Sequence, residues 1–218
     1  MNNESISSKT GTTRHPSRWV VCHRYGQTFR RRTPLSYQDA KSDPQLLQRG
    51  RMNAVVAFYK NLVGTPFQQI WRIAAQKGGC SGYNLFVMYN INAFDKDGYI
   101  FDYSNIDLSE GKLQLPAEMK VAATGENAIT VTWEEVPGQT PARANDRLMA
   151  AVIYEHAPFE VFICPTDASR RGEQRALISL DRQGNETVHL YVFFRTEGSD
   201  QFSEQRYFKL EAVNPSIP

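Results

Sequence analysis

The C-terminal half of the chain alternates short apolar runs with turn residues, and this spacing constrains the fold more than any other feature. Period-2 alternation is clearest at residues 129–133 and 188–194, as expected for strands with one buried face. Nine candidate strands follow Gly98: 99–103, 112–115, 120–123, 128–134, 147–154, 159–164, 175–180, 188–195 and 205–210. About seven strands separated by regular turns are typical of an antiparallel β-sandwich, so one or two of these runs are expected to be loops. We expect Trp133 to lie in its core and His189 to face solvent.

Residues 42–97 predict two to three helices. Ser42 is a good N-cap, and Gln45 three residues later completes a capping box. Thr65 and Pro66 repeat this start signal, while apolar residues recur at close to the 3.6-residue helical period. Glycines at 64 and at 78–79 are expected to end the first two helices. A third helix, capped by Ser81, is apolar on nearly all sides, which predicts that it is buried.

The N-terminal segment predicts a short β-hairpin at residues 18–32. Aromatic and β-branched residues favour strands there, and Gly26 with Gln27 favours a turn. A hairpin is marginally stable alone in water, so we expect it to pair with another sheet, its own or a partner's. The predicted fold class is therefore α+β. It divides into a basic extended arm with a hairpin at 1–41, a helical segment at 42–97 and the β-sandwich at 98–218.

The charge of the chain is divided unevenly along its length. Residues 1–60 hold eleven Lys or Arg and three acids, a net charge of +8, and the remainder carries −6, although the whole chain has only +2. Such an uneven charge distribution gives information about binding partners more than about the fold. The arm is expected to meet an anionic surface, which could be nucleic acid, a membrane face or the acidic body of a second copy. The side chains expected to bind the partner are Arg24, Arg30, Arg31, Arg32, Trp19, Tyr25 and Phe29.

The sequence carries no signal for chemistry. Its three cysteines, Cys22, Cys80 and Cys164, are widely spaced and odd in number, which favours synthesis in a reducing compartment. The four histidines lack metal-ligand spacing, and no nucleophile stands beside a base. We therefore expect no catalytic, cofactor-binding or metal-binding residue and no enzyme activity. No secretory signal or long apolar run is visible, so we expect no membrane partner and a cytoplasmic location on synthesis.

The N-terminal pattern resembles an uncharacterised family that is common in Bacteroidota and in their phages or prophages. The resemblance runs through residues 9–11, 20–21, 25–27 and 29–30, then through Gln45, Gln48-Arg49 and Arg51-Met52. It covers roughly residues 9–210. It departs from the family's pattern at 9–16, where Thr12 or Thr13 replaces the usual second glycine. The resemblance implies an N-terminal hairpin, a helical middle and a C-terminal immunoglobulin-like or fibronectin-III-like sandwich, and it implies no activity.

Three functional hypotheses follow. The first is a non-enzymatic structural or assembly protein, part of a phage virion or phage-like particle, which oligomerises through its arm or joins other subunits. The second is a binding module whose sandwich loops recognise a glycan or a surface protein. The third is nucleic-acid binding by the arm, for which residues 30–32 supply charge, although no motif of a known nucleic-acid fold accompanies them.

Overall fold

The computed structural model describes residues 19–24, 26–32, 39–76, 78–125, 127–135, 143–166, 169–183, 186–198 and 200–211. The chain forms two compact units, Met1–Lys41 and Ser42–Pro218, which are called the arm and the body below.

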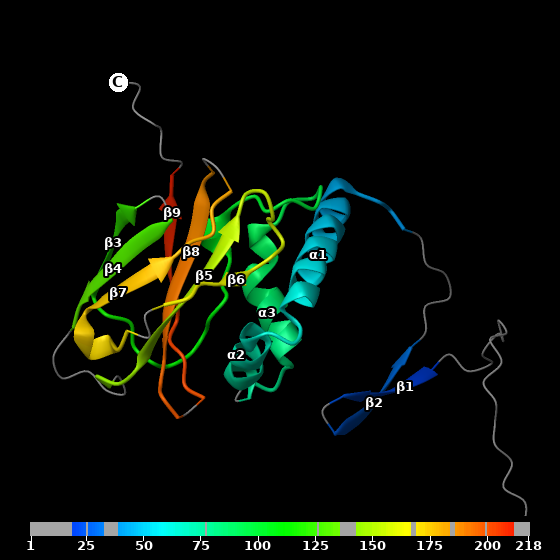
Figure 1. The fold of residues 1–218 in the computed structure, drawn as a ribbon. Coiled ribbons are helices and arrows are strands. Elements are labelled where there is room, and N and C mark those ends of the chain that lie inside the picture. The colour runs from blue at the N-terminus through cyan, green and yellow to red at the C-terminus, as the bar shows by residue number, and fades with distance from the viewer. Residues whose placement is uncertain are drawn as a thin grey trace, which may run out of the picture. The chain divides into compact units, whose positions relative to one another are not determined.

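The arm contains the predicted β-hairpin (Figure 1). Strand β1 (Trp19–Arg24) pairs in antiparallel register with β2 (Gln27–Arg32), from Trp19 opposite Arg32 to Arg24 opposite Gln27. Gly26 lies in the turn with a φ of 74°, a backbone conformation that favours glycine. Among the described residues, no third strand joins this sheet.

Three α-helices open the body, as predicted: α1 (Asp43–Leu62), α2 (Pro66–Ala75) and α3 (Gly82–Asn90). Each helix begins directly after the N-cap residue that the sequence predicts. The Ser42 backbone N–H donates to Gln45 Oε1 at 3.3 Å, and Ser81 Oγ accepts from the Asn84 N–H at 3.1 Å. Short 3₁₀ helices follow at η1 (Ile91–Ala93), η2 (Tyr103–Asn105) and η3 (Arg171–Glu173).

The prediction that α3 is buried on all sides is wrong. Phe86 and Asn90 are fully buried, but Met88 is 62% exposed and Tyr89 is 39% exposed. The helix packs on α1 and α2 with one side only, because it lies in an outer layer of the body. Tyr83, Leu85 and Val87 are partly buried against the helical core, whereas Met88 and Tyr89 face solvent.

Seven strands form the predicted sandwich. One sheet has the order β3 (Glu118–Gly125), β4 (Ala128–Glu134), β7 (Arg175–Ser179). The other has the order β6 (Phe162–Ile163), β5 (Arg147–Tyr154), β8 (Val188–Arg195), β9 (Arg206–Leu210). All pairings are antiparallel. Of the seven sandwich strands β3 to β9, the first, second and fifth along the chain form one sheet, and the other four form the second sheet. This is the grouping of an immunoglobulin-like sandwich.

Two of the nine candidate strands are loops. Residues 99–103 contribute an isolated bridge at Ile100 and the start of η2, and residues 112–115 contribute one bridge, between Leu113 and Ser203. Leu113 is 3% exposed and covers the sandwich core, and Ile100 and Tyr103 pack against the helical core, whereas Tyr99 is 69% and Phe101 77% exposed. Burial of a connecting segment produces the same residue types as burial of a strand.

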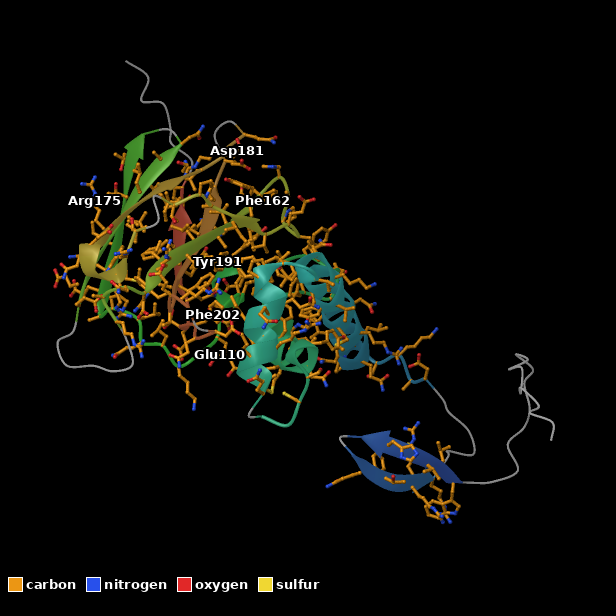
Figure 2. All side chains as sticks on the ribbon, turned by 60° about the horizontal axis from the view of Figure 1, so that its bottom comes forward. Glu110, Phe162, Arg175, Asp181, Tyr191 and Phe202 are labelled. Atoms are coloured by element: carbon orange, nitrogen blue, oxygen red, sulfur yellow. The ribbon has the colours of Figure 1, made fainter. Side chains whose placement is uncertain are left out.

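The body has three layers, with the four-stranded sheet in the middle (Figure 1). Its even-numbered β8 residues, such as Leu190 and Phe194, share a core with Trp133 and the three-stranded sheet. Its odd-numbered residues, such as Tyr191 and Phe193, share a second core with the helices, and Figure 2 shows Tyr191 between sheet and helices. Trp133 therefore lies in the sandwich core, as predicted. The change at residue 98 is one of secondary structure within a single compact unit.

The prediction that His189 faces solvent is wrong. The helical side of β8 is covered, and His189 is 4% exposed. Its ring stacks on Tyr103 with 3.5 Å between ring centres, and Nδ1 lies 2.9 Å from the Tyr207 hydroxyl. Burial lowers the pKa of His189 to about 4, because the uncharged ring suits an apolar site.

A substitution at Gly50 tests how closely α1 packs against the backbone of Lys96. A Cβ at this position would lie 2.0 Å from the Lys96 carbonyl oxygen. Replacing a helical glycine by alanine ordinarily stabilises a protein by about 1 kcal/mol. We predict instead that Gly50→Ala lowers the free energy of unfolding by roughly 1–3 kcal/mol through overpacking. Urea titration measures it, with exposed Asn53→Ala in the same helix as the control that should be neutral or stabilising. Stabilisation by Gly50→Ala would contradict this packing.

A second prediction concerns acid stability. Below pH 6.5 the unfolded chain protonates His189, whereas the folded chain does so only near pH 4. His189 should therefore cost up to roughly 3 kcal/mol of stability as the pH falls through this window. The advantage of the wild type over His189→Gln, measured by urea titration at each pH, should shrink from pH 7 to pH 4. A difference that does not vary with pH would contradict the buried, neutral ring.

Candidate partner-binding surfaces

The hairpin presents two chemically different faces. Side chains opposite each other in antiparallel strands project to the same side, so Val20 with Arg31 and Cys22 with Phe29 share one face. This face, called the apolar face below, holds the apolar side chains of Val20, Cys22 and Phe29 beside Arg31 and Gln27, and Phe29 is 46% exposed. Exposed apolar side chains on a two-stranded sheet are typical of a surface that a partner covers.

The opposite face of the hairpin combines charge with an aromatic ring. Trp19 lies opposite Arg32 and Val21 opposite Arg30. The Arg32 guanidinium lies 5.7 Å from the centre of the Trp19 ring, within cation–π range. Trp19 is 53% exposed, so this face offers both cationic groups and a flat ring to a partner.

The seven predicted partner-binding residues therefore do not form one surface. Trp19, Arg30 and Arg32 share the cation–π face, while Phe29 and Arg31 lie on the apolar face. Tyr25 lies outside the described residues, and Arg24 is described only by its backbone pairing with Gln27. The sequence cluster at 30–32 is divided by strand alternation.

The body carries an acidic recess that the sequence did not predict. It is lined by Tyr89, Asp107, Ser109, Glu110, Glu204 and Gln205. Gln205 holds the two sides together, because its Oε1 accepts from the Leu108 N–H at 2.8 Å and its Nε2 donates to the Ile106 carbonyl. Glu204 is more than 90 residues from Asp107 and Glu110 in sequence. Local spacing therefore gives no signal for it.

The carboxylates of the acidic recess repel one another. Burial, and then the charge of Glu204, raise the pKa of Asp107 to about 6. Burial, Glu204 and Asp107 also raise the pKa of Glu110, and the charge of Glu110 raises the pKa of Tyr89. A cationic partner would relieve this repulsion.

Three further observations concern metal binding, the buried thiol and the buried guanidinium of the described residues. No group of three or more His, Cys, Asp or Glu is placed there to hold a metal ion. Cys164 is buried, which raises its thiol pKa to about 12. The guanidinium of buried Arg171 is bound by Glu135 at 2.8 Å and by the Gln114 carbonyl. Within the described part of the chain, no helix has the length and apolar character needed to span a membrane.

Comparison with solved structures concerns the sandwich. The fibronectin type-III domain of human contactin 1 matches with 15% identity over 50% of this chain and 88% of that domain, at a TM-score of 0.32. The domain of human fibronectin type III domain containing protein 3 matches with 16% identity over 50% of this chain and 95% of that one, also at 0.32. The sensor domain of the anti-sigma factor RsgI4 from Pseudobacteroides cellulosolvens has 15% identity and covers 46% of this chain and 89% of its own, at 0.30. These are distant likenesses, and the fold class rests on the strand pairing described above.

The protein is thus an α+β protein built on an immunoglobulin-like sandwich. Residues 12–208 match the model of a family of unknown function, DUF6266, and the chain belongs to that family. No curated protein matches it.

Proposed function

We propose that this protein is a non-enzymatic assembly module that associates with a second copy of itself through the N-terminal hairpin. The observation that carries the proposal is the exposure of the hairpin to solvent. Both faces of the two-stranded sheet are exposed, and such a sheet is marginally stable without a partner. A partner that covers the apolar face or extends the sheet would stabilise it.

Charge supports a second copy as that partner. The arm holds eight Lys or Arg and two acids, a net charge of +6, and the body carries −4. The acidic recess offers Glu110 and Glu204 on the body, where the pKa of Glu110 is already raised by burial and by its acidic neighbours. Arginines from another copy's arm would neutralise these carboxylates and lower the cost of holding them together.

Nucleic-acid binding by the arm is the second candidate. The cation–π face favours it, because Arg30 and Arg32 suit phosphates while exposed Trp19 offers a ring on which a base can stack. This function predicts an affinity that falls steeply with salt. Glycan recognition by the sandwich loops and a phage particle as the setting remain predictions, and genes for portal, terminase or capsid proteins beside this one would support the latter.

A charge exchange between arm and recess tests the proposal. Three variants are compared: Arg30→Glu with Arg31→Glu and Arg32→Glu; Glu110→Lys with Glu204→Lys; and the combination of the two. We predict that each set alone dissociates the assembly and that the combination restores it. Size-exclusion chromatography with light scattering, at several protein concentrations, measures the mass.

Matched controls separate a specific contact from a general charge effect. Glu118→Lys with Glu134→Lys makes the same change in charge at exposed positions on β3 and β4 and should leave the mass unchanged. The proposal fails if the wild type is monomeric at every concentration, or if the combined variant stays dissociated. An arm variant that loses oligonucleotide binding while its mass is unaltered would support the second candidate instead.

A further inference from the structure

Three arginines form a row across one end of the four-stranded sheet. Arg147 lies opposite Arg195 in the β5–β8 register, and an antiparallel bridge places Arg170 on the other side of Arg147. Opposed residues project to the same side of a sheet. For this row it is the helix-facing side, because Met149 and Phe193, two residues along the same strands, pack against the helical core.

The arginine row is incompletely neutralised within the described part of the chain. Glu197 forms the one ion pair found there, with its Oε1 2.5 Å from Arg147. The Arg195 guanidinium lies over the Phe202 ring, 5.6 Å from its centre. Asp146 is turned into the preceding turn, where Oδ2 accepts from the Arg143 N–H at 2.7 Å. Like charges directly opposite in adjacent strands are destabilising, so the row is explained more readily by an anionic partner than by stability.

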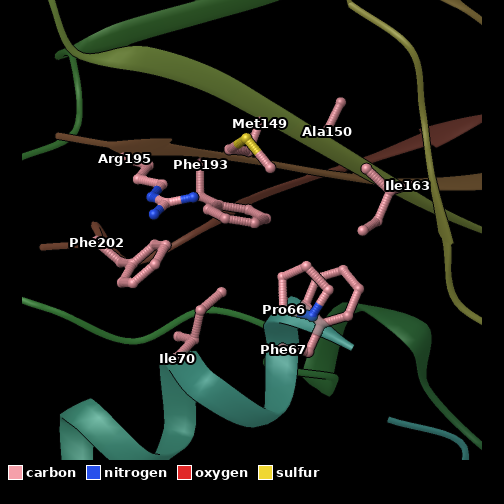
Figure 3. Close-up of a pocket in the computed structure, with 9 residues that line it drawn as sticks. All are labelled: Pro66, Phe67, Ile70, Met149, Ala150, Ile163, Phe193, Arg195 and Phe202. Carbon is pink, nitrogen blue, oxygen red and sulfur yellow. The ribbon is translucent and has the colours of Figure 1, made fainter. Parts of the chain in front are cut away.

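An apolar slot adjoins the arginine row. Pro66, Phe67 and Ile70 of α2 form one wall of the slot, as Figure 3 shows. The sheet side consists of Met149, Ala150, Ile163 and Phe193, and Arg195 and Phe202 stand at one end. The cavity measures about 40 Å³. That is room for one small aliphatic group and not for a nucleobase.

A more open recess shares the lining residues Met149 and Arg195 with the slot. It measures about 240 Å³ and is lined also by Arg147, Thr196, Glu197 and Gly198. Thr196 is 4% exposed, and its Oγ1 is buried without a hydrogen-bond partner in the described structure. This oxygen is covered by protein atoms, so the charged side chains that a ligand can meet in the recess are those of Arg147, Arg195 and Glu197.

We propose that this end of the sheet binds an extended peptide segment of a protein partner in which an aliphatic residue stands next to Asp or Glu. The aliphatic side chain enters the slot beside Phe67 and Ile70, and the carboxylate meets Arg195 and Arg170. Charge complementarity selects the acid, and the size of the slot selects the aliphatic neighbour over a base or an aromatic ring. This site is separate from the hairpin surface and does not depend on the assembly function.

A peptide array identifies this chemistry directly. Each peptide carries one pair of neighbouring residues in a constant Ser/Gly frame, and the array presents every pair. The labelled full-length protein should bind pairs that combine Val, Ile or Leu with Asp or Glu at least tenfold more strongly than the same pairs with Asn or Gln. The strongest peptide is then synthesised, and its affinity is measured by fluorescence anisotropy.

Matched variants assign the binding to the proposed site. The double variant Arg170→Gln with Arg195→Gln should bind the synthesised peptide at least tenfold more weakly than the wild type. Arg175→Gln with Arg206→Gln, which removes the same charge from exposed positions on β7 and β9, should not. The variant Ile163→Ala should bind the aliphatic–acidic peptides more weakly, but on the array it should still prefer Asp and Glu over Asn and Gln. Equal thermal melting of the first pair and the wild type shows that folding is intact.

The proposal is overturned by any of three results. They are an array without preference for the aliphatic–acidic pairs, an equal loss of peptide affinity in the two pairs of arginine variants, and displacement of the peptide by an oligonucleotide that binds more tightly through Arg170 and Arg195. Because the hairpin is unaltered in these variants, their mass in size-exclusion chromatography reports the assembly function separately.

Discussion

The two-sided burial of β8 is the constraint on which the rest of the body depends. Its residues from Val188 to Phe194 are all buried, and they alternate between the sandwich core and the helical core. A strand covered on both faces must be apolar on both faces, and neither layer can be removed without exposing it. The helices and the sandwich therefore form one unit.

The body carries charged surfaces of both signs. The acidic recess and the arginine row occupy different parts of the body and carry opposite signs, while the arm adds a third surface that is basic and partly apolar. Exposed pairs of charges contribute little to folding, so these clusters are better explained by what they bind. Under the two proposals, the opposite signs would direct a basic arm to the acidic recess and an acidic peptide to the arginine row.

The sequence predicted local features well and three-dimensional neighbours poorly. Caps at Ser42 and Ser81 and the alternation in β8 depend on residues close in the chain, and the structure has the elements they predict. The burial of His189 could not be predicted, because period-2 alternation does not reveal that helices cover the second face of the sheet. The recess that joins Asp107 to Glu204 and the row that joins Arg147 to Arg170 and Arg195 arise from strand register and loop packing, for which one sequence gives no spacing rule.

The central claim is that the body is self-sufficient while the hairpin gains its stability from a second copy. Hydrogen–deuterium exchange, read by mass spectrometry on one sample at low and high protein concentration, tests both parts together. Amides of residues 19–32 should exchange rapidly in dilute solution and become protected on concentration, while β5 and β8 stay the slowest elements under both conditions. Equal exchange of residues 19–32 at both concentrations, in a sample shown by light scattering to have assembled, would contradict the account.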